Sequence, residues 1–415
     1  MKKLLSIIFS MVAMLTVHAQ AGYDFEAPDV YGNTLRYKIT DATRNQVKMV
    51  QLNGTINGPL DIPAQVENGG VTYNVVGVVG LYIMGGSSIT HLTFHEGLEE
   101  IGYTTFWGTN LGNSELIFPS TVTSYSGGAF YQTRWDAPSV TIRILNPIPA
   151  PGYNGCPAFD VTGIGGGGNI FVPQNLKLIV PTDVTRAYCN ETTPCGAGGY
   201  SWSSYADYYR EEVKIGASGY ATLYLANENF EVPTGCEAFV IESIVPSATP
   251  GERKKANAKK FVAGSIIPAG QAVILKGTAG QTYEYKANVS GTPVTIAQNL
   301  LVGTATEQTL NAPGYKYFLF GSGPNGQGFY RQTGHDISSI HLKAHKAGLR
   351  IPASVAGSAK AFTIDFDEAE DGSVTAIRDI ETDNHRPDII YNLQGQRVTR
   401  PEKGIYIVNG KKKVY

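Results

Sequence analysis

The chain has 415 residues, of which 16% are charged, and its formal net charge at pH 7 is −2. This length allows two or three domains, and the nearly balanced charge excludes the broad basic field that gathers nucleic acid or anionic lipid. The 48 glycines and 24 tyrosines, with frequent valine, isoleucine and threonine, favour turns and strands over helices, so we expect an all-β protein.

The first twenty residues have the pattern of a secretory signal peptide. Lys2 and Lys3 precede an apolar run over residues 4–17, and a small-residue cleavage pattern ends at Ala19. The run is shorter than the roughly 20 apolar residues of a membrane-spanning helix, and no later stretch approaches that length. We expect cleavage near Ala19, no transmembrane segment, and a mature protein that is secreted or held at the outer cell surface.

A repeat with a period of 24 residues follows. Five apolar positions of one unit return in the next: Leu92, Phe94, Leu98, Ile101 and Phe106 recur as Leu116, Phe118, Val122, Tyr125 and Phe130. The strand positions continue at Val140 and Ile142, and an earlier copy begins at Leu60 and Ile62, with an insertion over 67–74. A unit this small cannot bury its apolar face alone, so neighbouring units must stack and share one core. The pattern predicts a solenoid of short repeats.

The end of the repeats needs a cover, and the stretch 200–213 is a candidate cap. Trp202, Tyr205, Tyr209 and Val213 have helical spacing, which places them on one face of a helix. Nearby, Cys189 and Cys195 are six positions apart, and a local disulfide between them is one of the pairings open to the four cysteines of this chain. The other two are Cys156 and Cys236, and the sequence does not fix the connectivity.

The repeat resembles that of the BspA-like leucine-rich repeat family, whose units read L-x-F-P-x-x-V-x-x-I-G-x-x-A-F. The segment 116–130 carries this pattern from Leu-Ile-Phe-Pro to Ala-Phe, and 98–106 carries its second half. The resemblance covers roughly residues 30–213 and departs from the pattern at 152–169, where a glycine-rich loop replaces a regular unit. It implies adhesion to host or neighbouring-cell components and supplies no ligand residues that can be transferred.

From residue 214 the period stops, and irregularly spaced strand-like runs begin at 221–225, 238–241, 271–275, 315–320 and 361–366. Turn residues separate them, which predicts a β-sandwich or partial barrel over 214–368. The phrases at 219–224 and 267–275 resemble a β-sandwich module that follows such repeats in bacterial surface proteins.

Residues 369–415 form a linker and a small β tail. Asn409-Gly410 suits a type I′ turn, so residues 405–408 should pair with 411–415. The tail resembles the C-terminal sorting domains of the type IX secretion system, which implies export across the outer membrane.

No motif carries a convincing chemistry. The loop 163–168 matches a dinucleotide fingerprint in letters alone, because a strand rather than a helix is expected after it. His341 and His345 have a metal-binding spacing but lack the glutamate between them and are followed closely by glycine and proline. We therefore expect no catalytic residues, no metal and no cofactor.

The sequence thus predicts an all-β chain with four parts: a signal peptide (1–19), a leucine-rich repeat solenoid (20–213), a β-sandwich module (214–368) and a β tail (369–415). The expected function is binding of extracellular protein or glycan, not nucleic acid, through outward strand side chains: Thr90, Thr93, Glu115 and Thr141. A structural envelope scaffold is the alternative, and a secreted hydrolase with a diffuse site in 214–368 ranks last. The oligomeric state is not indicated.

Overall fold

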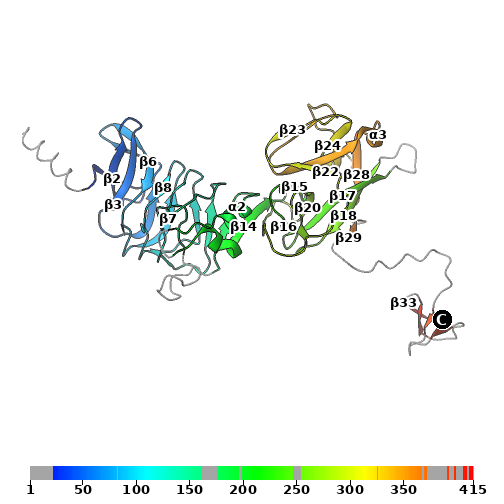
Figure 1. Cartoon of the computed structure of the whole chain (residues 1–415), viewed down its shortest axis with the longest axis horizontal. Coiled ribbons are helices and arrows are strands. Elements are labelled where there is room, and N and C mark those ends of the chain that lie inside the picture. The colour runs from blue at the N-terminus through cyan, green and yellow to red at the C-terminus, as the bar shows by residue number, and fades with distance from the viewer. Residues whose placement is uncertain are drawn as a thin grey trace, which may run out of the picture. The chain divides into compact units, whose positions relative to one another are not determined.

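The computed structural model describes residues 22–81, 83–159, 175–195, 199–245, 254–324, 326–366 and 369–371, and in the tail the strand residues alone (Figure 1). The signal peptide and the glycine loop 163–168 lie outside these residues. The chain is mostly β, with 43% strand and 5% helix, which confirms the all-β prediction. It forms two compact units, one up to Ser373 and one from Val374 to Tyr415.

The first unit begins with a six-stranded sheet. Its main path runs β1 (Phe25–Pro28), β2 (Thr34–Asp41), β3 (Gln46–Leu52), β6 (Val71–Val78) and β5 (Gln65–Asn68), and β8 (Glu100–Ile101) pairs with β6. The predicted insertion over 67–74 forms the tip of the β5–β6 hairpin, and its turn residues Gly69 and Gly70 have positive φ. Parallel pairing of β6 with β3 joins this hairpin to the strands before it, and parallel pairing with β8 joins it to the repeats that follow.

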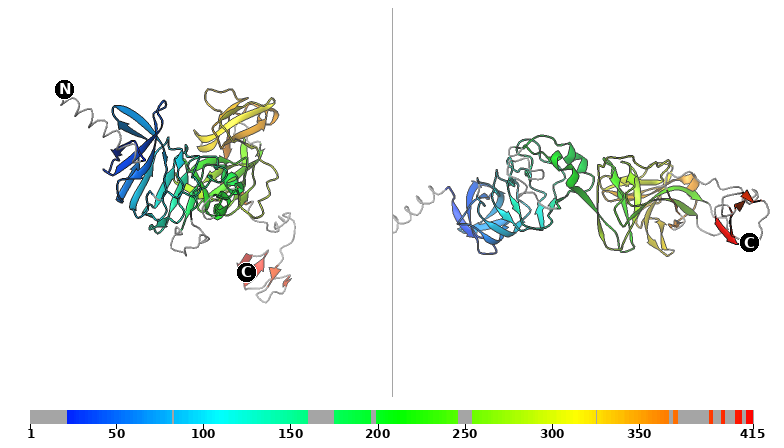
Figure 2. Two further views of the ribbon diagram at one scale, coloured as in Figure 1. Left: turned by 60° about the vertical axis from the view of Figure 1, so that its left-hand side comes forward. Right: turned by 90° about the horizontal axis from the view of Figure 1, so that it is seen from below.

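Successive repeats are joined by two parallel ladders (Figure 2). One contains β4 (Asn57–Ile62), β7 (Ser88–Phe94), β9 (Asn110–Leu111) and β11 (Arg134–Trp135), and the other contains β10 (Glu115–Phe118), β12 (Thr141–Ile144), β13 (Lys177–Ile179) and β14 (Tyr209–Lys214). Leu60 lies opposite Leu92, and the rings of Phe106 and Phe130 stack with centroids 4.7 Å apart. Both contacts join positions that the sequence identified as equivalent.

The register between β10 and β12 differs from the prediction. Leu116 pairs with Ile142 and not with Val140, because the spacing there is two residues longer. Three residues separate β9 from β10, whereas five separate β11 from β12, and Pro138 lies among the five. A shift of two keeps the same side of the strand inward, so Val140, Ile142 and Ile144 are all buried.

The cap differs from the single helix that was expected. A 3-10 helix, η1, spans Trp202–Tyr208, and it is preceded by α2 (Thr185–Asn190). Trp202 and Tyr205 are buried on η1, whereas Tyr209 and Val213 lie on β14, where alternate residues are buried. The helical spacing was also compatible with strand alternation from Tyr209 onward, and pairing with β13 favours the strand.

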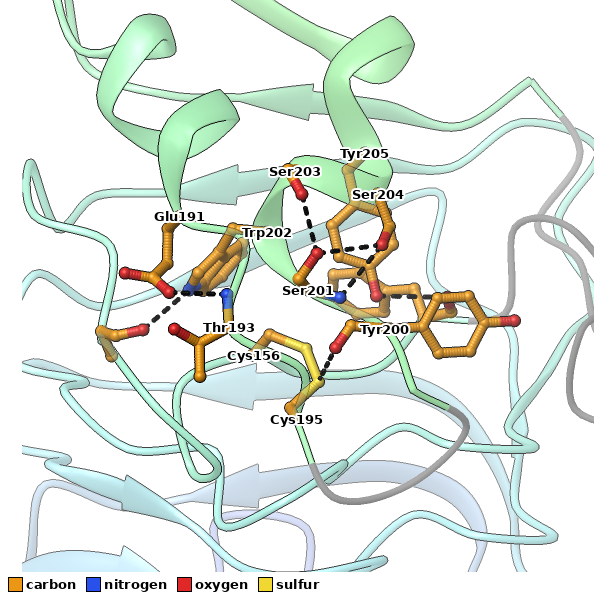
Figure 3. The surroundings of a disulfide bond; sticks show 12 residues. Cys156, Glu191, Thr193, Cys195, Tyr200, Ser201, Trp202, Ser203, Ser204 and Tyr205 are labelled. Carbon is orange, nitrogen blue, oxygen red and sulfur yellow. Dashed lines mark hydrogen bonds between the residues drawn. A yellow bond between two sulfur atoms is a disulfide. The ribbon is translucent and has the colours of Figure 1, made fainter.

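The disulfide also corrects the local pairing considered above. Cys195 is bonded to Cys156, with their Cα atoms 5.6 Å apart (Figure 3). Cys189 is a free thiol. The Cys195 backbone N–H donates to the Tyr200 carbonyl at 2.6 Å. The disulfide and a hydrogen bond of 3.1 Å from the Trp202 indole to the Ala150 carbonyl both join the cap region to the segment 150–156.

The remainder of the first unit is built around a ten-stranded sheet. Its members are β15 (Tyr220–Tyr224), β20 (Ala272–Lys276), β17 (Glu237–Val245), β18 (Lys255–Phe261), β28 (Ala361–Ile364), β25 (Gly326–Tyr330), β24 (Tyr315–Gly323), β27 (Lys346–Pro352), β22 (Leu301–Thr304) and β29 (Glu370–Asp371). The two ends of the sheet meet, because the Ala347 N–H donates to Thr222 Oγ1 at 3.1 Å and the Tyr224 N–H donates to the His345 carbonyl at 3.2 Å. The sheet is therefore nearly closed and barrel-like.

Smaller elements complete this region. They are β21 (Thr282–Tyr285), which pairs with β14, the pairs β16 (Phe230–Glu231) with β19 (Ile266–Ile267) and β23 (Gln308–Leu310) with β26 (Ile340–Leu342), and the short helix α3 (Ala353–Ala356). Tyr209 closes the core of the repeats, and Val213 belongs to the next core. The two cores therefore share the strand β14.

The second unit contains β30 (Ile390–Tyr391), β31 (Arg397–Val398), β32 (Ile405–Val408) and β33 (Lys411–Val414). Val408 pairs with Lys411 and Ile405 with Val414. The predicted hairpin is confirmed.

Candidate functional site

A groove of about 370 Å³ opens on the surface of the repeats where strands β9 and β11 begin. Its side-chain walls are Trp107, Asn110, Gln132 and Arg134, and Gly86, Ser87 and Gly108 complete the lining. Asn110 and Arg134 are directly opposite each other in the parallel β9–β11 pair. Side chains at such paired positions point to the same side of a sheet, so the groove is a feature of neighbouring repeats.

The base of the groove repeats from one unit to the next. The Gly86 N–H donates to the Gly108 carbonyl at 3.3 Å, and the Gly108 N–H donates to the Gln132 carbonyl at 3.2 Å. All three residues have positive φ, at 77° for Gly86, 69° for Gly108 and 55° for Gln132. They occupy equivalent positions, and Gln132 replaces the glycine of the two earlier units.

Two buried hydroxyls fix the backbone directly after Gly108 and Gln132. Thr109 Oγ1 donates to the Met84 carbonyl and Thr133 Oγ1 donates to the Phe106 carbonyl, each at 2.9 Å. Both threonines are buried. Because these bonds tie each turn to the turn of the preceding repeat, the side chains that follow are presented by a rigid backbone.

Gln132 positions Trp107. The indole Nε1 of Trp107 donates to Gln132 Oε1 at 2.6 Å, and 37% of Trp107 remains exposed. A residue with a Cβ atom in the left-handed backbone region destabilises the fold by about 1–2 kcal/mol relative to glycine at the same position. Glutamine at position 132 therefore strains the backbone, and its side chain supplies a hydrogen-bond acceptor for the indole.

The four residues predicted from the sequence lie on outward positions of the repeat strands. Thr90 and Glu115 are exposed and Thr93 and Thr141 are half-buried, and Glu115 pairs with Thr141 across β10 and β12. None of them lines the groove as the structure describes it. The carboxylate of Glu115 binds Arg143 at 2.5 Å, within an ion-paired group that also contains Glu212.

A signal in the sequence marks the groove. Gly-Ser-Ser at 86–88 recurs as Gly-Thr-Asn at 108–110 and as Gln-Thr-Arg at 132–134. The copies begin 22 and 24 residues apart, and the third copy has glutamine where the first two have glycine. That departure, with Trp107 one residue before the second copy, would have identified the groove.

A second cluster has unusual acid–base chemistry. Glu211 on β14 is fully buried and accepts hydrogen bonds from Tyr285 Oη and Thr185 Oγ1, both at 2.8 Å. Glu228, 2% exposed, accepts from the backbone N–H groups of Thr185 at 3.1 Å and Arg186 at 2.7 Å. Burial, followed by its hydrogen bond with Glu211 and that group's charge, raises the pKa of Glu228 to about 9. The pair holds a proton between two chain segments that meet at the start of α2.

The remaining sequence candidates are separated in the structure. His341 lies on β26 and binds Glu307 at 2.9 Å, while His345 lies in the turn before β27, so the two share no helix face. Within the described part of the chain, no three histidine, cysteine or acidic side chains are grouped as metal ligands.

No protein-family model matches the chain, and no curated protein matches it significantly. None of the helices in the described ranges is both long and apolar enough to cross a membrane.

Proposed function

We propose that this chain is an exported cell-surface or secreted binding protein of the BspA-like leucine-rich repeat type, and that it adheres to extracellular glycan or protein through its repeats. The observation that carries the proposal is the groove, in which an exposed indole is held by a strained glutamine beside Asn110 and Arg134. Side chains fixed in this way lose little conformational entropy on binding, which is a common property of recognition surfaces.

The proposal treats the repeats as a solenoid. Its support is the pair of parallel ladders, in which equivalent residues of consecutive units are hydrogen-bonded neighbours, and the shared core of leucines and phenylalanines. A solenoid offers a laterally extended surface without a deep pocket, which suits a large or repeating ligand. In this reading, the barrel-like region acts as a spacer and the tail as a sorting module.

The composition of the groove favours a glycan over a flat protein surface. Indole faces pack against the apolar faces of sugar rings, and planar amides and guanidinium groups donate to hydroxyl and carboxylate oxygens. The groove volume lies at the small end of the range found for small-molecule sites.

The test is binding of the mature full chain to an array of glycans, mucins and extracellular matrix proteins. We expect a set of bound ligands that is lost with Trp107→Ala and kept with Tyr31→Ala, which removes an aromatic side chain exposed elsewhere on the first unit. Binding that survives Trp107→Ala would move the site away from the groove. Capture of bacterial envelope proteins alone would replace adhesion with the envelope-scaffold alternative.

A further inference from the structure

The charge of the groove is one-sided. Among its described lining residues, Arg134 is the one ionised side chain, and it is exposed at the start of β11. Asn110, opposite Arg134, and Gln132 are neutral amides. Asp136, two residues further along the chain, lies outside the lining. The groove therefore combines one cationic side chain and two amides with the indole of Trp107.

The indole of Trp107 and the backbone segment that carries Arg134 are fixed relative to each other. Trp107 is bound to Gln132, and Gln132 is separated from Arg134 by Thr133, whose hydroxyl is tied to the Phe106 carbonyl. Phe106 is in turn the residue before Trp107. The indole and the backbone that carries Arg134 thus belong to one hydrogen-bonded circuit across two repeats.

Arginine rather than lysine suits recognition of a planar anion. The guanidinium presents paired N–H donors whose spacing matches the two oxygens of a carboxylate. A pyranose ring with a carboxylate substituent combines the two features that the groove matches, an apolar ring face and a planar anion at its edge.

We infer that the groove binds a pyranose sugar that carries a carboxylate, of the uronic acid class, with its ring against Trp107 and its carboxylate on Arg134. This inference depends on the proposed glycan-binding function and narrows it to acidic sugars. Asn110 donates to or accepts from ring hydroxyls beside the carboxylate.

The test uses the mature full chain and matched pairs of ligands. The probes are oligosaccharides of hyaluronan, alginate and polygalacturonate, each compared with its carboxyl-reduced form, and binding is measured by calorimetry and tryptophan fluorescence. We expect at least one acidic probe to bind roughly 10-fold or more tightly than its reduced form, as befits a charge-assisted contact. High salt should shrink this preference.

Three variants assign the preference to residues. Arg134→Gln should reduce the acidic preference to about twofold or less while leaving the reduced sugar bound, and Trp107→Ala should abolish binding of both forms. Arg44→Gln, which removes one positive charge from an exposed arginine on the same unit, should change neither. Circular dichroism and melting curves confirm that each variant is folded.

The outcomes separate this inference from the function on which it depends. Equal binding of acidic and reduced forms, lost with Trp107→Ala, would overturn the acidic preference and leave glycan binding intact. Binding of matrix proteins alone would overturn the sugar and leave adhesion. An absence of all binding on the arrays would overturn both.

Discussion

The indole Nε1 of Trp107 donates a hydrogen bond of 2.6 Å to Gln132 Oε1, and the two residues are 25 positions apart in consecutive repeats. Gln132 has a φ of 55° at a position where the preceding units have glycine. The contact therefore requires a strained backbone at Gln132. Because of this strain, the effect of Gln132 on stability and its effect on the site can be measured separately.

The first prediction concerns this separation. Gln132→Gly should leave the free energy of unfolding unchanged or raise it by up to about 1 kcal/mol, because relief of left-handed strain is partly offset by the greater entropy of an unfolded glycine. The same change should weaken binding of a groove ligand roughly 3- to 10-fold, as expected for one lost hydrogen bond that orients Trp107. Denaturant titration and fluorescence titration measure the two effects. A loss of more than 2 kcal/mol at unchanged affinity, well beyond the roughly 1 kcal/mol expected, would show that Gln132 is structural.

Much of the repeat architecture could be predicted from the sequence, because its signal is local and periodic. The alternation at Leu92 and Phe94 and its recurrence fix which side chains face inward, and Asn409-Gly410 specifies a two-residue connection by its backbone preferences alone. The register at Ile142 could not be predicted, since it depends on the length of the connection between β11 and β12.

The candidate site was harder to predict for a physical reason. Thr90 and Glu115 follow from strand alternation, whereas the groove depends on Trp107 and Gln132 meeting across a turn whose conformation is not periodic in hydrophobicity. The local pairing of Cys189 with Cys195 was wrong for a similar reason. Cys156 and Cys195 are 39 residues apart in the sequence, and packing of the cap brings them together.

The second prediction concerns pH. The pKa of Glu228 is about 9 in the folded state, whereas that of an unfolded glutamate is near 4.5. The folded state therefore binds more protons between these values, so this group's contribution to stability is complete below pH 4.5 and is lost as the pH rises toward 9. We expect the free energy of unfolding to fall between pH 5 and pH 8, with a slope of at most about 1.4 kcal/mol per pH unit from one proton.

Glu228→Gln is the matched control, because the amide is neutral at every pH and can still donate to Glu211. It should flatten the pH dependence of denaturant unfolding relative to the parent chain. Asp183, which accepts from the Asn227 side chain at 3.0 Å, also faces Glu228 and is retained in both proteins. Parallel pH profiles for the two proteins would refute a shared proton at this junction.

The third prediction concerns the disulfide. Replacing Cys156 and Cys195 together by alanine should lower the free energy of unfolding by about 3–4 kcal/mol, the chain-entropy value for a closed loop of this length. Cys189→Ala removes a half-buried free thiol and should cost less than about 1 kcal/mol. Thermal unfolding with and without reductant measures both. Equal melting temperatures for the parent and the double variant would show that the bond adds no stability.

The fourth prediction concerns the tail. Deleting residues 372–415 should abolish labelling of the protein on intact producing cells by antibody or protease, while the repeats and the barrel-like region remain folded, because their described cores contain no residue beyond Phe366 other than Ala369. Labelling that persists after the deletion would show that the tail is not a sorting signal. Retention of both forms inside the envelope would favour the scaffold alternative.

The sharing of β14 by both cores determines how the first unit would respond to tension. Its first residues pair in parallel with β13, through Leu178 with Tyr209, and its last residues pair with β21, through Val213 with Tyr283. A pull applied from the C-terminal side runs along this strand, so the bonds to β13 are loaded in shear and must fail together rather than one by one. The linkage between the repeats and the barrel-like region would therefore resist stretching by flow, which a flexible linker at the same place would not.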